Sequence, residues 1–120
     1  MLGEVLGSPP YLAPERWVGV QDADWRPSDQ YAAGVTIFEL LSAGRVPLEF
    51  GDSYETYFRA HLGGRLFPLR VPELGARELP SVDAALARML AKRPEARFPD
   101  IAECKRELDA ALALDGVDTP

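Results

Sequence analysis

The sequence has little of what several common classes of protein require. Its 120 residues include one cysteine, Cys104, so an intramolecular disulfide is excluded and a reducing compartment fits. The one histidine, His61, has no cysteine or second histidine at ligand spacing, which argues against a metal centre. No apolar run approaches the about 18 residues of a membrane span, and Met1 to Glu4 lack the basic start of a signal peptide. We therefore expect a cytoplasmic protein without a membrane segment.

Positive charge is also scarce. Lysine and arginine together number 13 against 19 aspartates and glutamates, which gives a formal net charge of -6. Nucleic acid and anionic membranes need a basic face, and no cluster of lysine or arginine provides one. Nucleic acid is therefore not expected as a partner. The length and the 47% of hydrophobic residues fit one globular domain or part of one.

The stretch from Pro27 to Gly44 predicts one long buried helix. Pro27 suits the first turn of a helix and Gly44 suits the position just after its end. Apolar side chains point in every direction of the helical wheel, and after the first turn only Thr36 and Glu39 interrupt them. A helix without a polar face is typical of a central element that other elements pack against.

Two residues of this stretch need an explanation. Asp29 falls in the first turn, where a carboxylate is favoured by the helix dipole and can accept hydrogen bonds from free amides. Gly34 costs about 1 kcal/mol relative to alanine inside a helix, so we expect another backbone to approach closely there.

The remaining helices are predicted from caps and periodicity. Ser53 begins a helix over Tyr54 to Leu62 that ends at Gly63, with His61 as a partly exposed residue near its end. Ser81 caps a helix of about ten residues, and Asp100 begins the last one, with Glu103 completing a start like a capping box. The predicted buried stripes are Val82, Leu86, Met89 and Leu90 in the first of these, and Ile101, Cys104, Leu108, Ala111 and Leu112 in the second.

No strand pattern of any length appears, and the connection over 65–80 is long and rich in proline. The predicted fold class is therefore all-α with long loops. Residues 115–120 are expected to fray.

Four separated motifs occur in one order along the chain, at 7–15 (GSPPYLAPE), 28–35 (SDQYAAGV), 44–48 (GRVPL) and 93–98 (RPEARF). Together they resemble motifs of eukaryotic-like (Hanks-type) serine/threonine protein kinases of bacteria. Residues 7–15, GSPPYLAPE, are similar to the end of the activation segment with its APE motif. Residues 28–35, SDQYAAGV, resemble the start of the F helix, and 44–48, GRVPL, resemble the segment after it, with Leu48 in place of phenylalanine. Residues 93–98, RPEARF, resemble the turn before the last helix. The resemblance implies an incomplete C-terminal lobe over residues 1–114, with the F, G, H and I helices, and a tail over 115–120.

The resemblance also implies roles for single residues. Glu15 is expected to pair with Arg97, and Asp29 to accept hydrogen bonds from amides of the family's catalytic loop; with Gly34, these are structural residues. The substrate-binding positions are Ser8, Pro9, Pro10 and Tyr11, of which Ser8 stands where the family has a threonine.

The helix at Tyr54 corresponds to the G helix, a docking surface in the family. Tyr54, Tyr57 and Phe58 are its candidate docking residues. A helix that simply packs on the core explains the same aromatic residues, and both interpretations stay open.

The family's Gly-rich loop, strand lysine, HRD loop and DFG aspartate do not occur in these 120 residues. We therefore expect no catalytic residue and no bound ATP, Mg²⁺ or other metal in this chain by itself. Met1 falls inside what resembles an activation loop, which favours a truncated or split kinase over a non-catalytic binding module. The expected partners are a protein substrate or the missing kinase segments, and the uncovered F helix predicts self-association.

Overall fold

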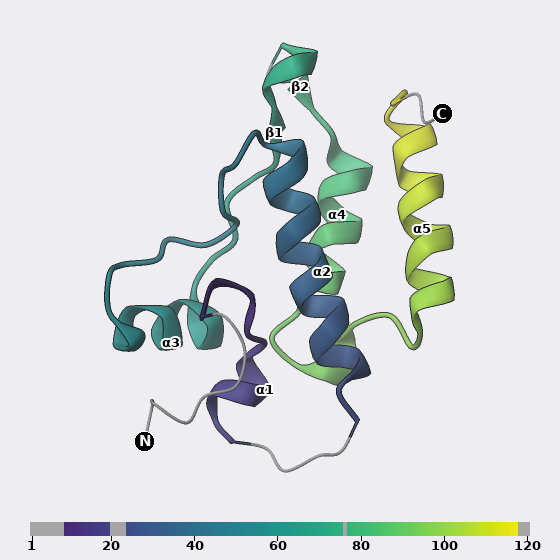
Figure 1. The fold of residues 1–120 in the computed structure, drawn as a ribbon. Coiled ribbons are helices and arrows are strands. Elements are labelled where there is room, and N and C mark those ends of the chain that lie inside the picture. The colour runs from purple at the N-terminus through teal and green to yellow at the C-terminus, as the bar shows by residue number, and fades with distance from the viewer. Residues whose placement is uncertain (1–8, 20–23, 76, 118–120) are drawn as a thin grey trace.

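The structure is a computed structural model and describes residues 9–19, 24–75 and 77–117. It confirms the predicted all-α class, because helices make up most of the described chain (Figure 1). The α-helices of this part are α1 (Pro14–Trp17), α2 (Arg26–Leu41), α3 (Tyr54–Gly63), α4 (Pro80–Met89) and α5 (Ile101–Leu114). The 3-10 turns are η2 (Pro9–Tyr11), η3 (Pro72–Leu74) and η4 (Pro94–Ala96).

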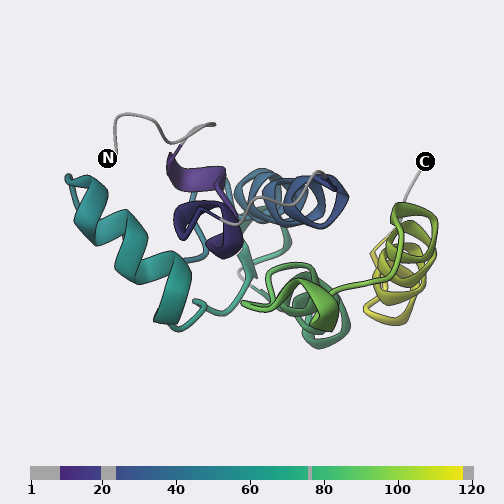
Figure 2. The same cartoon turned by 90° about the horizontal axis from the view of Figure 1, so that it is seen from below.

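Helix α4 contacts both α2 and α5, whereas α3 lies to one side, where it contacts α1 and η2 (Figures 1 and 2). The larger core cluster is built around α4, whose predicted stripe is buried as expected. A smaller cluster joins the segment before α1 to α2 and to the end of α4. Its buried members are Ala13, Tyr31, Val35 and Leu90.

Helix α2 is less enclosed than the sequence predicts. Tyr31, Val35 and Phe38 are buried, but Thr36 is exposed and Leu40 is 76% exposed. The prediction of a helix without a solvent face, made from the helical wheel, is wrong, whereas the uncovered side expected for an F helix without the missing kinase segments is present in the described part of the chain.

Gly34 lies where α2 meets the end of α4. A Cβ added at Gly34 would lie 3.1 Å from Cδ2 of Leu90 and 3.1 Å from Cβ of Met89. Contacts this short leave no room for a larger side chain without displacing a neighbour. A close neighbour is therefore present at Gly34, but it consists of side-chain atoms of Met89 and Leu90 and not of the backbone expected from the sequence.

Helix α2 is followed, after its cap Ser42, by two residues with left-handed backbone, Ala43 (φ 59) and Gly44 (φ 93). The amide of Gly44 donates to the carbonyl of Glu39 at 2.8 Å, which satisfies one of the free carbonyls at the end of the helix. Glycine adopts this conformation without steric cost, whereas alanine adopts it only with a steric cost from its Cβ. The turn therefore carries local strain at Ala43.

The predicted caps have mixed outcomes. Ser53 accepts a hydrogen bond from the amide of Thr56 as the cap of α3, and Asp100 accepts one from Glu103 in α5. Ser81 is not a cap. The amides of Ser81 and Val82 donate instead to the carboxylate of Asp115, at 3.2 and 2.8 Å. Because α4 and α5 lie side by side, the end of one helix caps the start of the other.

In the C-terminal region, Asp115 accepts the hydrogen bonds just described, and the amide of Val117 donates to the carbonyl of Leu112. The fraying of the tail stays a prediction. Residues 118–120 lie outside the described part. Ile101 was expected in the buried stripe of α5 but is 65% exposed, while Cys104 is buried.

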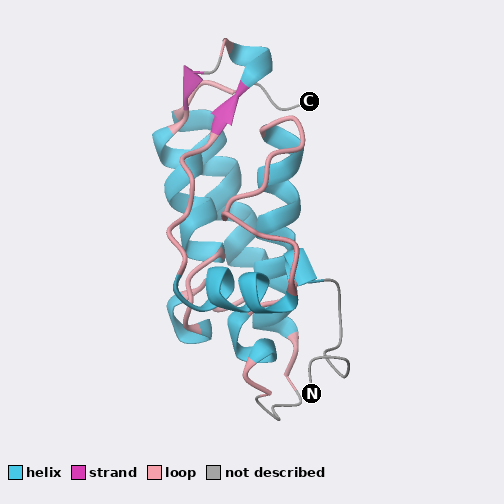
Figure 3. Cartoon of the chain, turned by 90° about the vertical axis from the view of Figure 1, so that its left-hand side faces the viewer, coloured by secondary structure: helices cyan, strands magenta, loops and turns pink. Residues whose placement is uncertain are grey.

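The long connection over 65–80 contains a small antiparallel ladder that the sequence did not predict. Strands β1 (Arg70–Val71) and β2 (Arg77–Glu78) pair Arg70 with Glu78 and Val71 with Arg77. The ladder lies at one end of the molecule, beyond the ends of the helices (Figure 3). Among the described residues, no helix is long and apolar enough to cross a membrane.

Candidate functional site

A buried ion pair joins α1 to the turn before α5. Arg97 Nη1 donates to Glu15 Oε2 at 2.7 Å, and Arg97 Nη2 donates to Glu15 Oε1 at 2.9 Å. The Arg97 side chain is 0% exposed and that of Glu15 is 10% exposed. Burial raises the pKa of the Glu15 carboxyl, but hydrogen bonds from Arg97, from the backbone and from Ser28 outweigh it, so the pKa lies below its usual range. Glu15 is therefore ionised at neutral pH, and the pair is a two-pronged contact between charged groups.

Arg97 also holds two other parts of the chain. Its Nε donates to the carbonyl of Ala91 after α4, and its Nη1 donates to the carbonyl of Pro27 at the start of α2. The hydroxyl of Ser28 donates to Glu15 Oε2 at 2.8 Å and accepts from Arg16 Nε at 2.8 Å. One guanidinium thus ties α1, α2 and the region after α4 together.

Gln30 makes a contact that the sequence analysis missed. Its side-chain amide donates to the carbonyl of Phe98 at 3.0 Å, and its side-chain oxygen accepts from the amide of Phe98 at 3.1 Å. The signal in the sequence was a polar residue directly before Tyr31 in a helix expected to be buried. A buried polar side chain needs hydrogen-bond partners, and here they are the backbone groups of Phe98, in the loop between η4 and α5.

His61 is fully buried, so its predicted place as a partly exposed helix-end residue is wrong. Its ring is 0% exposed, with Nδ1 2.7 Å from the hydroxyl oxygen of Tyr31 and Nε2 2.8 Å from the carbonyl oxygen of Pro9. Burial lowers the pKa of His61; the hydrogen bond to the Pro9 carbonyl raises it and the charge of Lys92 lowers it, and together they place it at about 4. Helix α3 turns this side chain inward because it packs across α1, where Trp17 stacks on the imidazole at 5.8 Å.

The predicted substrate-binding positions fall at the start of the described chain. Ser8 lies outside the described residues, and Pro9, Pro10 and Tyr11 form the half-buried turn η2. This turn contacts α2 and α3. A hydrogen bond with Glu39 and burial both raise the pKa of the Tyr11 phenol.

Glu39 itself has an unusual environment. In the described part of the chain, its Oε1 is buried and has no hydrogen-bond partner. A buried acceptor without a donor is rare in folded proteins and identifies a place where a partner is missing. The carboxylate therefore offers one free acceptor beside Tyr11.

The other predicted site residues are distributed over two helices. Asp29 is exposed in the first turn of α2 and is not part of the ion-pair network. On α3, Tyr54 is 47% exposed, Phe58 lies against Trp17, and Tyr57 lies 4.7 Å from Phe50 between ring centres. The three candidate docking residues of α3 are thus also in contact with other aromatic rings of the chain.

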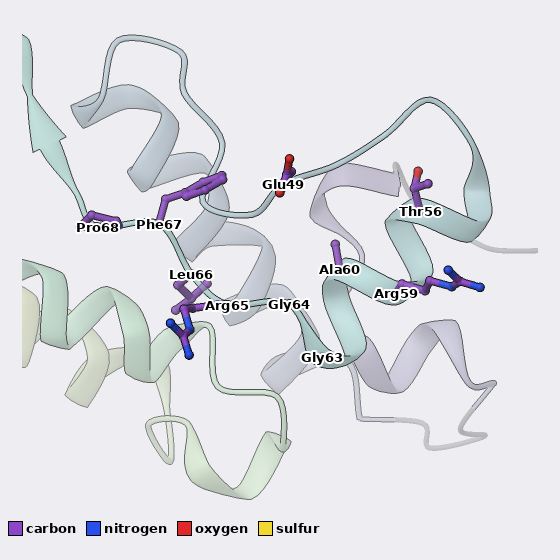
Figure 4. A pocket seen from close by; sticks show the side chains of 10 residues that line it. All are labelled: Glu49, Thr56, Arg59, Ala60, Gly63, Gly64, Arg65, Leu66, Phe67 and Pro68. Atoms are coloured by element: carbon purple, nitrogen blue, oxygen red, sulfur yellow. The ribbon is translucent and has the colours of Figure 1, made fainter.

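A hollow of about 650 Å³ lies between α3 and residues 64–68 (Figure 4). The side chain of Arg59 extends away from the hollow and pairs with Glu55. The guanidinium of Arg65 lies on the far side of Leu66. The polar groups at the border of the hollow do not converge on one point. Among the described residues there is also no group of three or more side chains suited to a metal ion.

Comparison with known proteins gives several relatives that match most of the chain. The serine/threonine-protein kinase PksC of Streptomyces coelicolor is 38% identical over 105 residues, which are 88% of this chain and 18% of that protein. The serine/threonine-protein kinase Pkn1 of Myxococcus xanthus is 37% identical over 115 residues, 92% of this chain and 15% of the relative. The serine/threonine-protein kinase PknB of Mycolicibacterium smegmatis is 34% identical over 104 residues, 87% of this chain and 16% of the relative. No model of a protein family matches the chain.

The chain spans less than a fifth of the length of each of these relatives. The chain is 34 to 38% identical to these relatives over nearly its whole length, and its helical fold agrees with the kinase C-terminal lobe. The chain is therefore a homologue of one segment of these much longer serine/threonine protein kinases.

Proposed function

We propose that this chain supplies the substrate-binding and scaffold part of a serine/threonine protein kinase domain. The family's reaction is phosphoryl transfer from ATP to serine or threonine side chains of proteins. The observation that carries the proposal is the two-pronged pair of Glu15 and Arg97. It fixes the segment that resembles the end of the activation segment, directly after the turn η2.

The residues divide into two roles. Pro9, Pro10 and Tyr11 line the pocket for the substrate residue that follows the phosphorylated one, and the hydroxyl of Ser8 favours serine or threonine substrates. Arg97 and Gly34 are structural: Arg97 completes the pair with Glu15, and Gly34 permits the contact between α2 and α4. Asp29 is also structural, and its exposed carboxylate is free to accept hydrogen bonds from the catalytic loop of a complete domain.

Glu39 supports a preference for basic substrates. Its Oε1 is a buried acceptor without a partner, and it belongs to the carboxylate beside Tyr11 in the proposed pocket. A lysine or arginine of the substrate would supply the missing donor and a compensating charge. We expect Glu39→Gln to raise the KM for a peptide with basic residues about tenfold, and to leave the KM for a neutral peptide unchanged.

Phosphoryl transfer itself is assigned to other segments of a kinase. The phosphates must be covered, magnesium must be held and a base must lie beside the substrate hydroxyl, and the motifs that do this are missing from these 120 residues. We therefore expect the purified chain by itself to bind no MgATP and to be inactive. Calorimetry with MgATP tests this expectation, and measurable heat of binding would contradict it.

The experiment that tests the proposal is the intact mass and activity of the native protein, captured from its cells with an antibody against residues 100–114. A mass corresponding to about 250 to 300 residues or more, with phosphorylation of a serine peptide, supports it. A protein of that size that phosphorylates no serine or threonine peptide would contradict it.

A non-catalytic binding module is the second candidate. It is favoured by the exposure of Tyr54, which extends an aromatic group formed with Trp17 and Phe58 to the surface of α3. Its partner would be a protein with an apolar patch. A native mass of 13.2 kDa, together with loss of a co-purifying protein in Tyr54→Ser, would favour this function over the first.

A further inference from the structure

The turn η2 has few means of holding its own backbone. Two of its three residues are prolines, which have no amide hydrogen to donate. The carbonyl oxygen of Pro9 accepts a hydrogen bond from Nε2 of His61, which lies on α3, 52 residues further along the chain. The position of the turn therefore depends on a side chain from another element.

The hydrogen bonds of His61 define which nitrogen carries the proton. A carbonyl oxygen can only accept, so Nε2 donates to Pro9. In the neutral ring Nδ1 is then an acceptor, and the hydroxyl of Tyr31 donates to it. Of the two neutral tautomers, only this one satisfies both nitrogens.

The groups around the ring disfavour a charge on it. Trp17 of α1 and Phe50 before α3 present uncharged rings, with centroids 5.8 and 5.0 Å from that of the imidazole. Lys92 donates to the carbonyl of Ala60, the residue before His61, and its charge opposes a second one. Tyr31 is the titratable group in direct contact, and behind it lies Arg97, 5.0 Å from its ring centre.

We propose that neutral His61 is a positioning residue that fixes the backbone of η2, and that it thereby determines how tightly a substrate binds. The proposal rests on the proposed function, because only that function makes η2 part of a substrate pocket. Protonation would place a charge in an enclosed apolar site and leave the hydroxyl of Tyr31 without an acceptor. The hydrogen bond to Pro9 favours the charged ring but does not outweigh burial, so the imidazolium would move to solvent and release the carbonyl of Pro9.

Two substitutions separate positioning from packing. His61→Phe keeps an aromatic ring against Trp17 but removes both hydrogen bonds. His61→Gln removes the ring but keeps one donor and one acceptor on the side-chain amide. A residue needed only for packing is replaced better by phenylalanine, whereas a positioning residue is replaced better by glutamine.

The first measurement is hydrogen exchange of the amides of residues 11–13 in the 120-residue chain, with helix α5 as an internal control. We expect His61→Phe to accelerate exchange at 11–13 about tenfold relative to α5, as for the loss of one net hydrogen bond, and His61→Gln to stay within about threefold of the wild type. Faster exchange in the glutamine variant than in the phenylalanine variant overturns the proposal. Equal exchange in all three proteins, or equal acceleration in both variants, also overturns it.

The second measurement is the same exchange between pH 7 and 4, corrected for the intrinsic rate. In the wild type, exchange at 11–13 should accelerate relative to α5 as the pH falls, and in His61→Gln it should not. If the exchange of residues 11–13 depends on pH in the same way in the wild type and in His61→Gln, the proposal is overturned.

Peptide kinetics on the native kinase then test the consequence for binding. We expect His61→Phe to raise the KM for the peptide about tenfold with kcat nearly unchanged, and His61→Gln to restore the KM. A fall in kcat with an unchanged KM overturns the proposal. If the native protein phosphorylates no peptide, the proposed function fails, while the exchange measurements still decide whether His61 positions η2.

Discussion

Replacing Glu15 by alanine should strongly destabilise the fold, because it leaves a buried guanidinium without its counter-charge. Arg97 is 0% exposed, and two of its hydrogen bonds, from Nη1 and from Nη2, end on the Glu15 carboxylate. Its remaining bonds, to the carbonyls of Ala91 and Pro27, carry no negative charge. The substitution therefore removes the counter-charge of Arg97 and leaves only carbonyl oxygens as its partners.

The expected cost follows from these contacts. Hydrogen bonds that involve a charged group contribute about 1.5 to 3 kcal/mol each, so losing two gives about 3 to 6 kcal/mol. Breaking a buried ion pair by removing one partner costs about 3 to 5 kcal/mol, which agrees. A domain of this kind has a total stability of about 5 to 15 kcal/mol, so Glu15→Ala should unfold a large part of the population or leave it close to the threshold.

Urea titration of the chain at one fixed concentration measures the free energy of unfolding. The double variant with Glu15→Ala and Arg97→Met should be at least about 2 kcal/mol more stable than the sum of the two single effects, because no charge stays buried alone. The matched control is Glu95→Ala, which breaks an exposed ion pair with Arg93 and should cost less than about 1 kcal/mol. A cost for Glu15→Ala no larger than that of the control would refute the reasoning.

Three further predictions concern stability. The pKa of His61 falls from 6.5 to about 4 on folding, so between these pH values the unfolded state binds more protons than the folded state. The contribution of neutral His61 to the free energy of unfolding is fully present above pH 6.5, and the free energy should fall by up to about 3 kcal/mol as the pH decreases towards 4. Urea midpoints measured against pH test this, and His61→Gln is the control that should not respond. Gly34→Val should cost about 1 to 3 kcal/mol or more, because even a Cβ would lie 3.1 Å from Leu90, and a thermal melt with an unchanged midpoint would contradict this packing. Ala43→Gly should stabilise the chain by about 0.5 kcal/mol, because it relieves the left-handed backbone at φ 59. A lower urea midpoint for this variant would show that the turn is not strained.

Local features of the fold could be predicted from the sequence where the causes are local. Ser53 and Asp100 cap their helices because a side-chain oxygen lies within three residues of the amide that it accepts from. The stripe that includes Leu86 and Met89 is buried because its spacing places these side chains on one face of α4. The pairing of Glu15 with Arg97 was implied only by the resemblance to kinases, since 82 residues separate them.

The wrong predictions concern features that depend on contacts between distant residues. Ser81 looks like a cap, but the carboxylate of Asp115 reaches the start of α4 from the end of α5 and takes its place. His61 looks like a helix-end residue, but α1 and α2 enclose it. The exposed side of α2 cannot be inferred from a helical wheel either, because the wheel shows which side chains are apolar and not which of them meet another element.

The segment from η2 to α1 shows why order at this site depends on the whole chain. It contains one turn of 3-10 helix and four residues of α-helix, too little for local structure to be stable by itself. Its contacts come from His61, 52 residues after Pro9, and from Arg97, 82 residues after Glu15. Contacts over such separations form only when the intervening helices are already packed, and they are lost when any of those helices moves. The order of this segment therefore reports on the packing of α2, α3 and the turn before α5 together, so a partner that shifts α3 would act on η2 through His61 without touching the turn itself.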